Sequence, residues 1–116
     1  MSTIQNGTWR FIQKWSDSSH YSFNATLING TLTINDGEFF GTYTALDGAN
    51  PGQIAIAIAD FTNRTITSYV GNYQGNLMGG QMVGAPDNGA ATPKGVWTAF
   101  HISILEINEG SYGIEV

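Results

Sequence analysis

Hydrophobic and polar residues alternate along most of this chain with a period of two residues, not the 3.6 residues of an α-helix. Around the motif Gly-Thr-Tyr, the side chains of Phe39, Tyr43 and Ala45 share one face with Gly41, and Phe40 lies on the other face. Because successive side chains of a strand point to opposite faces, the pattern predicts a strand with bulky residues on both sides. Gly41 indicates a tightly curved strand or the close approach of another backbone.

The same alternation predicts strands over residues 7–15, 21–27, 31–35, 53–61, 65–73, 77–84 and 95–107, with a short tail strand over 112–116. Between the second and third of these, Asn29-Gly30 is a strong hairpin signal, since both central positions of a type I′ turn need positive φ. No segment has helical periodicity, so we expect less than ~10% helix. The pattern predicts one all-β domain over residues 1–116, a single antiparallel up-and-down β-barrel of about eight strands. An open sandwich has the same turn spacing.

The segment 53–61 is unusual because both of its faces are apolar. Ile54, Ile56 and Ile58 alternate with three alanines at positions 55, 57 and 59. The isoleucine face suits a core, whereas the alanine face suits a second surface or the cramped interior of a small barrel. The alanine face and the apolar last strand exceed what one small barrel needs to cover, which predicts a homo-oligomer, either a dimer or a tetramer.

Composition and charge narrow the classes of partner. Hydrophobic residues make up 41% of 116 residues, enough for one core, and charged residues only 11%. No apolar run approaches the ~20 residues of a membrane helix, so no membrane is expected. The net charge is −5 and the four Lys and Arg residues are scattered, which argues against nucleic acid. The start lacks the regions of a signal peptide, so we expect a cytoplasmic protein, although secretion stays open because a leader can be removed.

Candidate chemistry is sparse. The chain has no Cys, and its two histidines, His20 and His101, lack partners at metal-ligand spacing, so both are interpreted as structural. Asp60 lies beside a turn and is interpreted as a turn cap. There is no Ser-His-Asp order, no useful carboxylate pair and no phosphate-binding glycine loop. We therefore expect a protein that is not an enzyme and needs no metal or cofactor.

Three stretches together resemble the avidin and streptavidin family. Residues 37–44, Gly-Glu-Phe-Phe-Gly-Thr-Tyr-Thr, resemble its second-strand motif, and either residues 7–9, Gly-Thr-Trp, or residues 14–15, Lys-Trp, resemble its opening Gly-x-Trp. Residues 65–73 resemble its Ser-x-Thr-x-aromatic-x-Gly-x-aromatic strand, and Trp97 is similar to the last-strand tryptophan that reaches a neighbouring subunit's pocket. The resemblance implies an avidin-like barrel that binds biotin or a related carbonyl-bearing small molecule at one end.

Aromatic and hydroxyl side chains supply the candidate ligand site, because aromatic rings combine apolar area with polar groups. The candidate ligand-binding residues are Asp17, Tyr43, Thr65, Thr67, Tyr69 and Trp97. In this hypothesis the Tyr43 hydroxyl meets the ligand carbonyl, Thr67 approaches from a facing strand, and Trp97 covers the apolar part.

Departures from the family keep other functions open. The chain has no tryptophan in the segments 53–61 and 77–84, where the family has one in each strand, and residues 16–36 contain an extra predicted hairpin. The aromatic residues could instead fill the barrel completely. The alternatives are a carbohydrate-binding, lectin-like β domain, suggested by Trp, Tyr, Asn and Asp on loops, and a self-assembling scaffold without a ligand.

Overall fold

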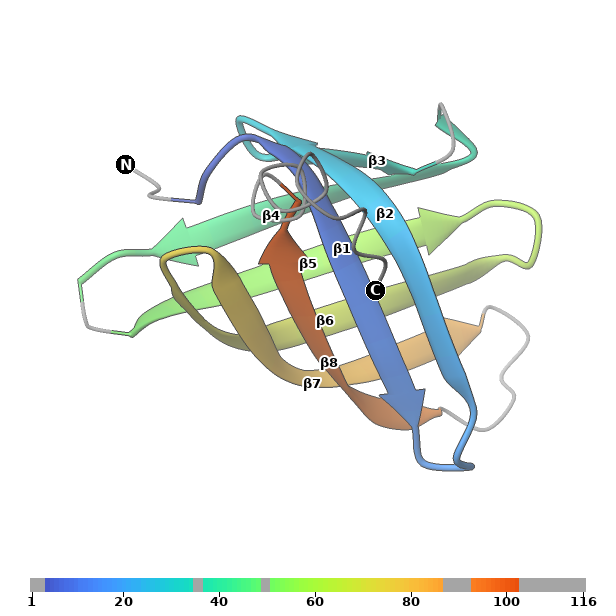
Figure 1. Ribbon diagram of the computed structural model, residues 1–116. Coiled ribbons are helices and arrows are strands. Elements are labelled where there is room, and N and C mark those ends of the chain that lie inside the picture. The colour runs from blue at the N-terminus through green and yellow to red at the C-terminus, as the bar shows by residue number, and fades with distance from the viewer. Residues whose placement is uncertain (1–3, 35–36, 49–50, 87–92, 103–116) are drawn as a thin grey trace, which may run out of the picture.

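The protein is an eight-stranded antiparallel barrel. The structure, a computed structural model, describes residues 4–34, 37–48, 51–86 and 93–102. These residues form no α-helix, and no helix among them is long and apolar enough to cross a membrane. The strands are β1 (Gly7–Trp15), β2 (His20–Ile28), β3 (Thr31–Ile34), β4 (Phe39–Leu46), β5 (Gly52–Asp60), β6 (Thr65–Gln74), β7 (Leu77–Pro86) and β8 (Lys94–His101) (Figure 1).

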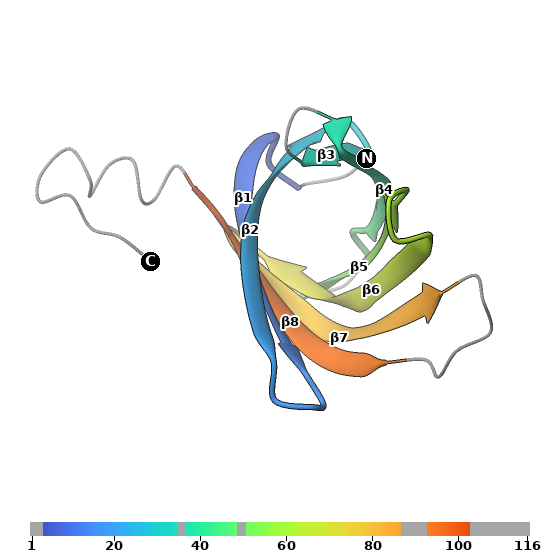
Figure 2. The same ribbon diagram turned by 90° about the vertical axis from the view of Figure 1, so that its right-hand side faces the viewer.

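Each strand pairs with the next along the chain, and β8 pairs back onto β1 to close the barrel. At this closing seam Trp9 lies opposite His101, and Trp15 lies opposite Gly95. Figure 2 shows the strands enclosing a ring around the barrel axis. The predicted all-β fold, its up-and-down order and its closure are confirmed, and the open sandwich is excluded.

Alternation along each strand separates an inner from an outer face, as the sequence predicts. The isoleucines of β5 are buried in the interior, where they join aromatic residues from β1, β4, β6 and β8 in one core. Ala55 and Ala57 face outward and are exposed. Of the two environments suggested for the alanine face, the cramped barrel interior is therefore wrong.

Element boundaries differ from the sequence prediction in a few places. The third strand ends at Ile34 and the seventh continues to Pro86. The last strand ends at His101, and the predicted continuation over 103–107 lies outside the described residues, as does the predicted tail strand over 112–116. The Gly-Thr-Tyr motif lies on β4, because the hairpin of β2 and β3 precedes it.

Two local signals in the sequence have the expected geometry. The turn residues Asn29 and Gly30 have φ angles of 48° and 93°, as a type I′ turn requires. At Gly41 a Cβ atom would lie 2.3 Å from the carbonyl oxygen of Ala57, so the backbone of β5 approaches too closely for any side chain. Gly41 therefore marks a close approach of neighbouring strands, one of the two readings that its position suggests.

The end of the barrel where β1 begins, here called the filled end, is covered by the residues that precede β1. Ile4 is buried in the core. The Trp9 indole donates a hydrogen bond of 2.9 Å to the carbonyl oxygen of Gln5, and His101 Nε2 lies 3.0 Å from the carbonyl oxygen of Asn6. These contacts hold the segment across the strand ends, and they give His101 the structural role that the sequence indicates.

Candidate functional site

The opposite end of the barrel, where β1 ends and β2 begins, holds a cavity of about 570 Å³ and is here called the open end. Aromatic side chains from four strands line it, namely Trp15, Tyr21, Phe23, Phe39 and Tyr69. Polar side chains share the lining, namely Gln13, Ser22, Asp60, Asn63 and Thr67. A cavity of this size, mainly apolar with a few polar groups, has the character of a small-molecule site.

A directed chain of hydrogen bonds runs along the inner wall of the open end. The Trp15 Nε1 atom donates to Gln13 Oε1 over 3.2 Å, and Gln13 Nε2 donates to the Tyr69 hydroxyl oxygen over 2.6 Å. An indole N–H can only donate, so it fixes which way the Gln13 amide points. The Tyr69 hydroxyl therefore accepts from Gln13 and keeps its own proton for another acceptor.

Burial keeps the Tyr69 hydroxyl protonated. Its ring is 2% exposed, and desolvation raises the pKa of Tyr69 well above its usual range, with the hydrogen bond from Gln13 opposing that rise only in part. Among the described residues Gln13 is the one hydrogen-bond partner of this hydroxyl. At neutral pH the open end thus presents a neutral phenolic donor.

Trp97 and Phe11 hold the Tyr69 ring from inside the core. The Trp97 ring meets Tyr69 edge-on, with centroids 5.6 Å apart, and stacks on Phe11 at 5.7 Å. The Trp97 indole donates to the carbonyl oxygen of Val70 over 3.2 Å, which fixes its orientation. Because these rings are buried and mutually packed, they hold the Tyr69 ring in a fixed position.

Two glycines of the neighbouring strands lie close to Trp15 beside the cavity. A Cβ atom at Gly95 would lie 3.0 Å from Trp15 Cα, and one at Gly84 would lie 3.8 Å from Trp15 Cη2. The indole therefore extends from β1 past β8 toward β7. Trp15 lines the cavity while remaining half-buried, so it can contact both the interior and an incoming molecule.

The rim of the open end carries a fixed carboxylate. Asp60 ends β5, and its two carboxylate oxygens accept hydrogen bonds from the Asn63 backbone N–H at 3.1 Å and from Asn63 Nδ2 at 2.9 Å. These bonds cap the β5–β6 turn, as the sequence interpretation of Asp60 proposes. Asn63 and Asp60 thereby present a rigid polar edge to the cavity.

The sequence-predicted site residues are only partly brought together. Thr67 and Tyr69 line the open end. Thr65 lies at the start of β6, where its hydroxyl donates to the Asn63 carbonyl oxygen over 3.1 Å, and it does not line the cavity. Asp17 lies in the β1–β2 loop, where hydrogen bonds from the Ser19 hydroxyl and N–H lower the pKa of Asp17 below its usual value.

Tyr43 and Trp97 lie away from the open end. Tyr43 faces the interior, as predicted, but it lines a separate crevice of about 390 Å³ together with Ile4, Asn6 and the β2–β3 turn. Trp97 is 2% exposed and packed within the core, so it does not cover the cavity of the open end. The predicted trio of Tyr43, Thr67 and Trp97 therefore does not converge on one cavity.

Sequence reasoning missed Gln13 and Trp15 as site residues. Alternation places both on the inner face of β1, where a glutamine among Trp9, Phe11 and Trp15 needs a buried partner. That buried glutamine was the available signal. Its partner, Tyr69, is 56 residues away along the chain, and only the closed barrel brings the two together.

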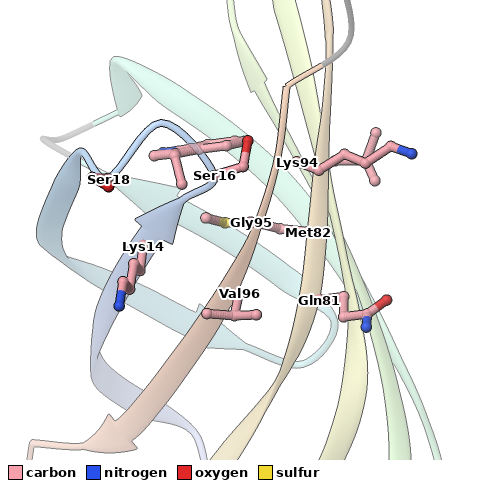
Figure 3. A pocket seen from close by; sticks show the side chains of 10 residues that line it. Lys14, Ser16, Ser18, Gln81, Met82, Lys94, Gly95 and Val96 are labelled. Carbon is pink, nitrogen blue, oxygen red and sulfur yellow. The ribbon is translucent and has the colours of Figure 1, made fainter.

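A second cavity of about 500 Å³ adjoins Trp15 at the seam of β1, β8 and β7. In Figure 3 the side chains of Lys14 and Lys94 extend toward opposite sides of this groove, with Gly95 and Met82 between them. The amino groups do not converge, so the groove has no anion-binding geometry. Trp15 lines both cavities.

Within the described ranges, no group of three or more His, Asp or Glu side chains could hold a metal ion. Comparisons of the chain with protein-family models, with curated proteins and with solved structures find no match.

Proposed function

We propose that the open end binds a small, uncharged molecule that carries a carbonyl oxygen on a flat apolar body, and that binding involves no catalysis. The observation that carries this proposal is the hydrogen-bond chain from Trp15 through Gln13 to Tyr69. It leaves one phenolic proton at the cavity without an acceptor among the described residues. A ligand carbonyl oxygen is the complementary group.

The surroundings of Tyr69 support the same class of ligand. Trp15, Phe23 and Phe39 are half-buried at the cavity and supply flat apolar area. The Thr67 hydroxyl lies two residues from Tyr69 on the same face of β6, and can contribute a second directional hydrogen bond. The cavity volume of about 570 Å³ falls within the range of roughly 300–1,000 Å³ found for ligand pockets.

Titration of the chain with biotin, the first probe, tests this proposal through quenching of tryptophan fluorescence. Tyr69→Phe keeps the ring but removes the donor, so we expect biotin affinity to fall roughly threefold to tenfold, as for a neutral hydrogen bond. Tyr43→Phe is the matched control and should leave the affinity unchanged, because Tyr43 lines a different crevice. Equal losses in the two variants would contradict the assignment of the open end.

Carbohydrate binding is the second candidate, favoured by the rim of the open end. Tyr21 is 59% exposed there, and Ser22, Asp60 and Asn63 line the same cavity. An exposed aromatic ring with neighbouring carboxylate and amide groups suits the apolar face and hydroxyl groups of a sugar ring. A glycan array with the intact chain and Tyr21→Ala would support this candidate if specific signals disappear in the variant.

A further inference from the structure

The outer surfaces of the barrel differ sharply in charge. The outward-facing residues of β4, β5, β6 and β7 include no Asp, Glu, Lys, Arg or His, and are here called the neutral face. The outer surface of β1, β2 and β8 carries Arg10, Lys14, His20 and Lys94. The neutral face spans four adjacent strands around one side of the barrel (Figure 1).

The neutral face also exposes apolar side chains, set among its Thr, Ser, Gln and Asn residues. Phe40 is 48%, Ile66 51% and Val70 54% exposed, and the alanines of β5 lie between these strands. Single exposed apolar residues are ordinary, but a contiguous set across neighbouring strands marks an interaction surface. Because β4 to β7 are fully paired in the sheet, this face offers side chains and not free strand edges.

The relief of the neutral face is complementary to itself. Ala55 is opposite Thr44 on one side and Val70 on the other, and a groove of about 480 Å³ lies over it, walled by Leu46 and Asn72. Ala55, on the alanine line of β5, is thus the floor of a groove, and the neighbouring outward line on β6 with Ile66 and Val70 is a ridge beside it. A twofold rotation places the ridge of one copy in the groove of another, and the reverse.

We propose that a second copy of this chain covers the neutral face and forms a twofold-symmetric dimer, with the β6 ridge of each copy in the β5 groove of its partner. Charge favours this occupant. In a twofold contact through the outer surface of β1, β2 and β8, the cations Arg10, Lys14 and Lys94 of the two copies would come together and repel. The neutral face lets them meet without opposing like charges, whereas a strongly charged partner would find no counter-charge on it.

The size of the face sets the strength of the dimer. Four strands at about 4.8 Å spacing and seven residues at about 3.3 Å rise give a patch of roughly 19 by 23 Å. The area of this patch is smaller than the roughly 800 Å² that each partner buries in a standard interface. We therefore expect reversible dimerisation at micromolar concentrations. Adjacent ridge and groove close the assembly at two copies, since a patch that met a distant pocket would instead form chains.

Sedimentation equilibrium across the micromolar range tests the proposal. The intact chain should reversibly dimerise, and high salt should not weaken the dimer. Ala57→Glu, the exposed alanine next to Ala55 on the outward line of β5, and Val70→Lys on the ridge should each raise the dissociation constant about tenfold or more, because each places a charge in an apolar contact. Mixing A57E with V70K chains should restore association, since the two charges then meet across the interface.

Thr26→Lys, an exposed outward position on β2, is the matched control and should leave dimerisation unchanged. Circular dichroism of each variant separates loss of folding from loss of association, and A57E and V70K test the same face independently. A chain that stays monomeric throughout the micromolar range would overturn the proposal. It would also be overturned by folded A57E and V70K variants that dimerise normally, or by a monomer captured on phosphatidylcholine vesicles.

Discussion

The two ends of the barrel are formed by the same eight strands, yet the segment before β1 covers one of them and leaves a crevice of about 390 Å³, whereas the other holds a cavity of about 570 Å³. At the filled end Trp9 is fully buried, and its indole donates to the backbone of a segment that lies across the strand ends. At the open end Trp15 is half-buried, and its indole donates to the side chain of Gln13. The comparison teaches that one strand, β1, supplies both the core tryptophan and the site tryptophan, and that their hydrogen-bond partners separate the two roles.

The largest effect that can sharpen this comparison is the loss of either tryptophan. Trp9→Ala should lower the free energy of unfolding by about 3–5 kcal/mol, because it leaves a large cavity in a close-packed core. Trp15→Ala should cost about half as much, since part of its ring already faces solvent. Urea denaturation measures both changes. A larger loss for Trp15 than for Trp9 would show that the open end is the structural one.

The second comparison concerns the two inward tyrosines. Tyr69→Phe leaves the buried amide donor of Gln13 without its acceptor and should lower the free energy of unfolding by about 1–3 kcal/mol. The Tyr43 hydroxyl has no hydrogen bond within the described residues. Tyr43→Phe should therefore change the free energy of unfolding by less than about 0.5 kcal/mol. Thermal unfolding of the two variants measures the difference, and similar melting temperatures would contradict it.

The smallest effect appears at alkaline pH. Burial raises the pKa of Tyr69 above its value in the unfolded chain, so the folded state holds this proton more tightly. The resulting stability is fully present below about pH 10, the usual tyrosine pKa, and declines as the pH rises further toward the folded pKa. Urea denaturation between neutral pH and about pH 11 should show this decline in the native chain and a smaller one in Tyr69→Phe. If the free energy of unfolding depends on pH in the same way in the native chain and in Tyr69→Phe, Tyr69 is not the group responsible for the decline.

Much of the fold followed from local chemistry. The alternation in segment 53–61 predicted a strand with isoleucines on one side, and Asn29-Gly30 predicted the hairpin between β2 and β3. The candidate site was harder to predict. Thr67 and Tyr69 were found because an aromatic and hydroxyl pattern is visible within one strand, whereas Gln13 has significance only beside a residue from β6.

The sequence by itself determined the class of fold, the faces of the strands and the positions of several turns, because these depend on residues within a few positions of one another. Only the tertiary structure decided which inward residues share a cavity. The register of the strands pairs Tyr43 with Ile56 and Ile56 with Tyr69. The same row of paired residues continues through Met82 and Gly95 to Trp15. Strands in a closed barrel tilt against its axis, so a row of paired residues climbs from one end to the other. Tyr43 and Tyr69 therefore lie on one row of paired residues but at different heights along the barrel axis, and they line different cavities. No local sequence pattern encodes this separation.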